Sequence, residues 1–253
     1  MSERLRLRSF LLSFLIIIIF ILSIISDGTA INYGVGVKKE EELVWNCNVC
    51  NKDEMKILFG NNWDNSGFFE DLNRGSKMKW KIKNIEINDT YLVIKVELWK
   101  WNSEKNWGIK DSNFQIIYFI NPKTYVNALN FSNYAFLVPF LFPIPVSEYL
   151  GNLKLNEWYD VDNRVLTTLN VEITKDQILT DYPTKDIKII AIYNERGILT
   201  SYKLYIKENV VIVDISFNKL PYFVIPALVC LTVCLSTAVI IYILKKKQSI
   251  KKY

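Results

Sequence analysis

The chain has 253 residues, of which 50% are hydrophobic and 23% are charged, and its formal net charge is +5. The basic excess lies in the first nine residues and the last nine, so the long middle segment 31–219 is close to neutral, and no nucleic-acid partner is predicted. The absence of histidine excludes Ser-His-Asp and Cys-His catalysis and zinc sites built on histidine.

Residues 1–30 have the pattern of a secretory signal peptide. Three arginines start the segment, a continuous apolar run extends from Phe10 to Ile25, and a small residue, Ala30, ends it. An uncleaved anchor is the alternative, because the length of the apolar run is near the lower limit for crossing a bilayer. In both cases the segment that follows is predicted to lie outside the cell.

Residues 31–219 are predicted to form a mainly β extracellular domain with a curved or meander antiparallel sheet. The segment is rich in β-branched and aromatic residues and alternates with period two. The stretch "TYLVIKVELWKW" places Leu92, Ile94, Val96 and Leu98 on one face, which we interpret as core. In "KMKWKIKNIEI" the alternation changes phase, which predicts a bulge near Asn84.

The end of this domain has the pattern of a β-meander. The stretches "DIKIIAIYN", "ILTSYKLYIK" and "VVIVDISF" are separated by the short turns "NERG" and "EN". Strands joined by tight turns pair antiparallel. Gly197 supplies the positive φ that the first turn needs.

A proline-rich stretch, "YAFLVPFLFPIPVSEYLGNL", interrupts the strand pattern from Tyr134 to Leu153. Its prolines exclude a membrane helix and a central strand. We interpret it as a loop and short helix that form a lid over an open face of the sheet. Phe140 and Phe142 are then either packed in the lid or in contact with a ligand or partner.

The segment Leu220–Leu244 contains no charged residue and is long enough to cross a bilayer as a helix. The basic tail 245–253 follows it directly, and lysines beside a span mark the cytoplasmic side. The sequence therefore predicts a single-pass cell-membrane protein that contacts membrane lipid through this segment, with its C-terminus in the cytoplasm.

This layout resembles a loose group of uncharacterised archaeal surface proteins of the kind encoded by Asgard-type lineages. The residues that carry the resemblance are the start "YGVGVKKEEELVWNCNV", the hairpin "YNERGILTSYKLYIK" and the junction "LPYFVIPALV". Glu40 and Glu41 stand where the group usually has Gly-Asp. The resemblance implies a signal peptide, a β-rich ectodomain and a C-terminal membrane anchor, and no known activity.

Cys47 and Cys50 form the one C-x-x-C of the middle segment. In a regular strand, residues three apart lie about 10 Å apart and point to opposite faces. A disulfide needs Cα atoms within about 7 Å, so the pair can bond only if the chain bends at Asn48–Val49. Two free buried thiols, or a bridge between two molecules, are the alternatives.

Two sequons and a tryptophan group complete the candidate sites. Asn88 and Asn130 begin Asn-x-Ser/Thr sequons, which accept glycans in exported proteins. Trp99, Trp101 and Trp107 lie close together in the sequence, where an aromatic surface could stack a sugar or anchor a partner, or pack within the domain.

These features predict a surface protein that binds a protein, an envelope polymer or a lipid without catalysis. No enzyme activity, metal or cofactor is expected. The alternative is a structural envelope component that assembles with copies of itself.

Overall fold

The computed structural model describes residues 32–65, 69–102, 107–125, 138–175, 183–206, 209–218, 232 and 235–237. The chain divides into the units Met1–Tyr33 and Gly34–Tyr253, and the description below concerns the second.

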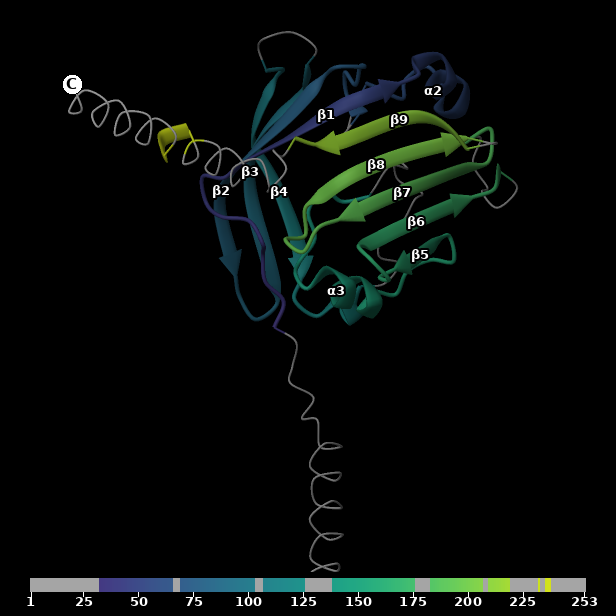
Figure 1. Cartoon of the computed structure of the whole chain (residues 1–253). Coiled ribbons are helices and arrows are strands. Elements are labelled where there is room, and N and C mark those ends of the chain that lie inside the picture. The colour runs from purple at the N-terminus through teal and green to yellow at the C-terminus, as the bar shows by residue number, and fades with distance from the viewer. Residues whose placement is uncertain are drawn as a thin grey trace, which may run out of the picture. The chain divides into compact units, whose positions relative to one another are not determined.

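One curved antiparallel sheet dominates the described residues (Figure 1), in the order β4-β3-β2-β1-β9-β8-β7-β6-β5. Its strands are β1 (Glu42–Cys50), β2 (Lys77–Ile87), β3 (Tyr91–Asn102), β4 (Lys110–Phe119), β5 (Tyr159–Asp162), β6 (Thr167–Ile173), β7 (Ile187–Tyr193), β8 (Leu199–Ile206) and β9 (Val210–Phe217). The helices are α2 (Lys52–Phe59), the 3-10 turn η2 (Pro122–Thr124) and α3 (Val146–Asn152). The predicted mainly β, antiparallel fold is confirmed.

The sheet consists of two meanders that join at its centre. Strands β1 to β4 follow one another toward one edge, and β5 to β9 run from the other edge back to the middle. The first and last strands, β1 and β9, pair with each other. The chain must therefore pass from one edge of the sheet to the opposite edge between β4 and β5.

Residues 138–145 of the proline-rich stretch lie in this connection, and we call them the Pro-rich segment. They pack on the buried face of the sheet, which we call the inner face; the opposite face is the outer face. The backbone of Phe142 donates to the carbonyl of Gly197 at 2.8 Å, and the backbone of Leu199 donates to the carbonyl of Phe140 at 2.9 Å. The Tyr193 hydroxyl donates to the Pro139 carbonyl at 2.7 Å. The backbone N–H and C=O groups of this segment, which belong to no strand, thus form hydrogen bonds with residues of the sheet and its β7–β8 turn.

Aromatic side chains form the centre of the core. Trp45 packs edge-on against Trp80 and Phe140, with ring centroids 5.1 and 5.0 Å apart, and all three side chains are buried. The Trp45 indole donates to the Leu199 carbonyl at 2.8 Å, so its polar atom is satisfied.

Three details of backbone geometry and burial match the sequence pattern. The β2–β3 register shifts between Ile82 and Asn84, which confirms the predicted bulge. The predicted core face of β3 is buried along its length, at Leu92, Ile94, Val96 and Leu98. Gly197 has φ 76, as the turn between β7 and β8 requires.

The membrane prediction concerns residues that are mostly outside this description. Of Leu220–Leu244, the structure describes residue 232 and residues 235–237, which are helical. Among the described residues, no helix has the length and apolar character needed to cross a membrane.

Candidate functional site

Two tryptophans and two lysines gather on the outer face of β2, β3 and the start of β4. The Lys79 ammonium lies 4.1 Å from the ring centroid of Trp99 and 5.0 Å from that of Trp107. The Lys110 ammonium, at the start of β4, lies 5.0 Å from the ring centroid of Trp99 in β3. We call these four residues the tryptophan–lysine cluster. Cation–π attraction of this kind favours the observed positions of the indole rings by about 0.5–1 kcal/mol.

The cluster is both ordered and accessible. The side chain of Lys79 is only 13% exposed, whereas Trp107 is 37% exposed and Ile109, two residues further along the chain, is 70% exposed. Exposed apolar groups rimmed by charge are typical of binding surfaces.

Ion pairs surround the cluster on the same face. Lys79 lies 3.6 Å from Glu42, and Lys110 donates to Glu97 at 2.8 Å. The hydrogen bond from Lys110 lowers the pKa of the Glu97 carboxyl, so that group is anionic at neutral pH. The face therefore combines flat aromatic rings with fixed charges that can donate and accept hydrogen bonds.

The other predicted aromatic contacts are not at the surface. Trp101, Phe140 and Phe142 are 3%, 3% and 2% exposed, so they belong to the core and present no face to a partner. For the two phenylalanines this agrees with lid packing. Trp101 departs from the alternation of its strand, since the pairing of β3 shifts register with both neighbours.

The sequence did not predict that Lys79 and Lys110 contact the tryptophan rings. Lys79 pairs with Trp99 across β2 and β3, and Trp99 pairs with Lys110 across β3 and β4. The alternation in "KMKWKIK" indicates that Lys79 faces outward, but which residue lies opposite depends on the strand register, which that alternation alone leaves open.

The bend required for Cys47 and Cys50 is present. Strand β1 shifts register against β9 between Cys47 and Val49, so Asn48 is an extra, bulged residue. The assumption of a regular strand, which pointed the sulfurs apart, was wrong here. Both residues are free thiols in the structure, so the disulfide stays a prediction.

Asn88 lies exposed in the turn between β2 and β3. Its side-chain oxygen accepts hydrogen bonds from the backbone of Thr90 at 2.9 Å and Tyr91 at 2.7 Å. These bonds use the oxygen and not the amide nitrogen that carries an N-linked glycan. Asn130 lies outside the described residues.

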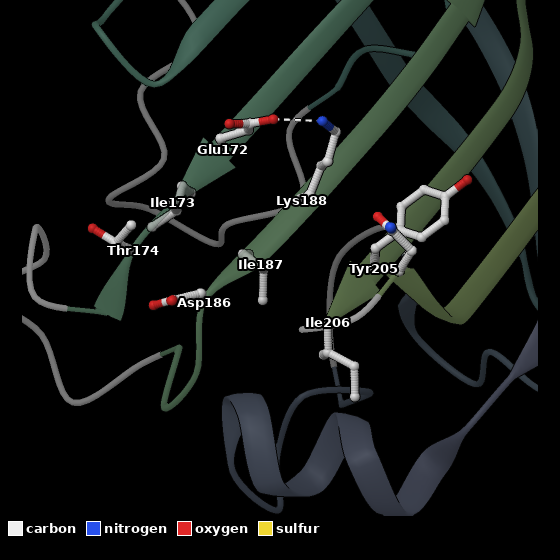
Figure 2. Close-up of a pocket in the computed structure, with 9 residues that line it drawn as sticks. Glu172, Ile173, Thr174, Asp186, Ile187, Lys188, Tyr205 and Ile206 are labelled. Carbon is white, nitrogen blue, oxygen red and sulfur yellow. Dashed lines mark hydrogen bonds and ion pairs between the residues drawn. The ribbon is translucent and has the colours of Figure 1, made fainter.

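A hollow of about 250 Å³ opens at the ends of β6, β7 and β8 (Figure 2). Its lining includes Glu172, Lys188 and Asp186. Glu172 and Lys188 pair with each other, and Asp186 accepts from the backbone of Lys175 at 2.9 Å. These charged groups already interact with other groups of the same chain. The hollow is therefore a weaker candidate for ligand binding than the tryptophan–lysine cluster.

Strand β4 lies at one edge of the sheet, where an open strand could pair with a second copy of the chain. Side chains occupy part of this edge. The Asp111 carboxylate accepts from the backbone of Asn113 at 2.9 Å, and the Tyr125 hydroxyl accepts from that of Phe119 at 3.0 Å. Local hydrogen bonds of this kind compete with pairing between molecules.

Within the described ranges, no group of three or more His, Cys, Asp or Glu side chains is arranged to hold a metal ion. Comparison of the chain with protein-family models, with curated proteins and with solved structures gave no match.

Proposed function

We propose that this chain is an exported, single-pass membrane protein whose β-sheet domain binds a partner outside the cell through the tryptophan–lysine cluster. The observation that carries this proposal is the pair of indole rings that contact the ammonium of Lys79, whose side chain is 13% exposed. Binding to rings that are already ordered costs little conformational entropy. The proposed action is binding without catalysis.

The partner that fits best is an envelope polymer made of sugar units. Sugar rings have apolar C–H faces that stack on indoles, and hydroxyl groups at their edges. Glu97 and Lys110 supply a charged acceptor and a charged donor beside the rings. A protein partner is the other outcome that the experiment below distinguishes.

The location rests on the two apolar segments of the sequence. Phe10–Ile25 follows a positive start, and Leu220–Leu244 precedes the lysine-rich tail. The resemblance to archaeal surface proteins supports the same arrangement. Protease treatment of intact cells tests it: residues 31–219 should be digested while a tag on the C-terminus stays protected.

The binding test uses the full chain in detergent and polysaccharide purified from the envelope of the source organism. Trp99→Ala and Trp107→Ala should each weaken binding about tenfold, since stacking on an aromatic ring contributes roughly 1 kcal/mol or more. The matched control is Ile117→Ala, an exposed apolar residue on the same face of β4, which is 54% exposed.

Equal binding by wild type and both tryptophan variants would refute the role of the cluster. Equal loss in Ile117→Ala would show a general effect on the sheet face. Binding to an envelope protein fraction, and not to the polysaccharide, would keep the cluster as the site and replace the sugar polymer by a protein partner.

A further inference from the structure

The bulge at Asn48 turns two cysteines of one strand toward the same side of the sheet. Cys47 pairs with Ile215 of β9, and Cys50 pairs with Val213. Residues directly opposite each other on neighbouring strands point to the same face. Ile215 and Val213 are 1% and 0% exposed, so both thiols face the inner side.

The bulged residue itself points the other way. The Asn48 amide donates to the Ser216 hydroxyl at 3.0 Å and to Asp214 at 3.4 Å, on the outer face. These bonds anchor the bulge. Because the partners of the two cysteines are two residues apart on β9, the cysteine Cα atoms are roughly 6–7 Å apart, which is within the reach of a disulfide.

The two thiols differ in surroundings. Cys47 is 1% exposed, and its Sγ donates to the Val49 carbonyl at 3.2 Å. Its backbone is held on the other side by Ser76 and Gly75, at 2.9 and 2.7 Å. Cys50 is partly exposed at the end of the strand, and its Sγ lies 3.7 Å from the Leu72 carbonyl.

The pKa values of the two thiols also differ, and the more exposed thiol, Cys50, is the more acidic one. A hydrogen bond that Cys47 donates to the thiolate form of Cys50, together with the charge of Lys52, lowers the pKa of Cys50. The same hydrogen bond, together with burial, raises the pKa of Cys47. A thiolate beside a lysine and at the start of a helix is the more reactive form of cysteine, and α2 begins two residues after Cys50.

We propose that Cys47 and Cys50 are a redox-reactive dithiol that closes to an intrachain disulfide by exchange with a small-molecule disulfide. Cys50 reacts first, because it is the accessible thiol, and Cys47 reacts second, because it lies beside Cys50 on the same face. This inference is independent of the proposed binding function.

The exchange has two balanced steps. The Cys50 thiolate attacks one sulfur of the small disulfide, forms a mixed disulfide and releases one small thiolate. Cys47 then gives its proton to that thiolate or to water and attacks the Cys50 sulfur, which expels the second small thiolate. The two protein thiols are oxidised, and the small disulfide is reduced to two thiols.

The first test follows the folded full chain in detergent, with Cys230→Ser and Cys234→Ser so that Cys47 and Cys50 carry all the thiols. We call this double variant the parent chain. Brief alkylation followed by peptide mapping should modify Cys50 at least about tenfold faster than Cys47, because Cys47 is 1% exposed and Cys50 is partly exposed. In denaturant the two rates should become similar. Faster modification of Cys47 in the folded chain would overturn the assigned order.

The second test adds oxidised glutathione. The parent chain should lose two hydrogen atoms in a single peptide that contains both cysteines. Cys47→Ser should stop at a mixed disulfide on Cys50, whereas Cys50→Ser should form almost none. Failure of the parent chain to oxidise while folded, or oxidation only to a dimer, would overturn the proposal. The parent chain decides this even where a serine variant does not fold.

Discussion

The guanidinium of Arg196 donates to both carboxylate oxygens of Glu41, each at 2.7 Å, across 155 residues of sequence. It also donates to the Gly36 carbonyl at 2.8 Å. These bonds tie the β7–β8 turn to the segment before β1. Both side chains are partly screened from water, so we expect Glu41→Gln to lower the free energy of unfolding by about 1–2 kcal/mol.

The matched control is Glu42→Gln, measured by the same denaturant titration. Glu42 is 50% exposed, and its contact with Lys79 spans 3.6 Å. Because the Glu42 carboxylate is half exposed and the contact is longer than a hydrogen bond, we expect this pair to contribute roughly 0–1 kcal/mol. The two variants should therefore differ, and equal losses would contradict a special role for the bidentate pair.

Gly197 is the residue at which the turn and the Pro-rich segment meet. It has φ 76, and a Cβ there would lie 2.1 Å from the Phe142 carbonyl oxygen. Gly197→Ala must therefore move backbone, and we expect a loss of about 2 kcal/mol or more in thermal or denaturant unfolding. Gly151→Ala is the control, since nothing lies within 4 Å of its Cβ position in α3, and it should be neutral or stabilising.

Local patterns predicted the strands and the meander well. Alternation in "TYLVIKVEL" and the phase change at Asn84 depend on neighbouring residues, and both correspond to the observed β2–β3 hairpin. The pairing of β1 with β9 was not predictable in this way. It joins residues far apart in sequence, and no local period specifies which strands meet.

The candidate sites show the same division. The sequence alone was enough to name Trp99 and Trp107 as candidate contact residues. Their contact with Lys79 could not be predicted, because it depends on the register between strands. The Asn48 bulge was recognisable only as a condition for a disulfide, because one extra residue in a strand leaves little trace in a short sequence pattern. The prolines predicted that the Pro-rich segment is a lid, whereas its place between opposite edges of the sheet is known only from the strand order.

Phe140 tests that role directly. Its ring packs against Trp45 and Trp80, at centroid distances of 5.0 and 5.5 Å. Phe140→Ala should leave a cavity in the core and lower the free energy of unfolding by about 3–5 kcal/mol. Ile117→Ala, an exposed change, should cost less than about 0.5 kcal/mol. Similar costs for both variants would contradict core packing of this segment.

Asn88 should carry a glycan when the chain is exported by a host with N-glycosylation. The residue is exposed, and the Asx turn to Thr90 and Tyr91 leaves the amide nitrogen out of the turn's hydrogen bonds. Glycosidase treatment followed by peptide mass measurement checks the site. Thr90→Ala should abolish the modification without changing Asn88, and a glycan that persists in this variant would rule out sequon-directed attachment.

Asp162 and Arg164 form a local pair at the end of β5 whose titration is measurable. Arg164 donates to Asp162 through Nε at 3.0 and 3.1 Å and through Nη2 at 2.6 Å. The guanidinium lowers the pKa of the Asp162 carboxyl from 3.8 to about 2. Because the folded pKa lies below the unfolded one, the stabilisation is present above pH 3.8 and is lost as the pH falls through about 2.

Titration of the Asp162 carboxyl by NMR checks this shift, with circular dichroism to confirm that the fold persists at low pH. Arg164→Gln should raise the midpoint toward the ordinary value for an aspartate. Added salt should raise it in the wild type as well, since Arg164 is 88% exposed and its charge is screened. A midpoint that Arg164→Gln leaves unchanged would mean that the backbone hydrogen bond from Arg164 to Asp162, at 3.0 Å, holds the carboxylate instead.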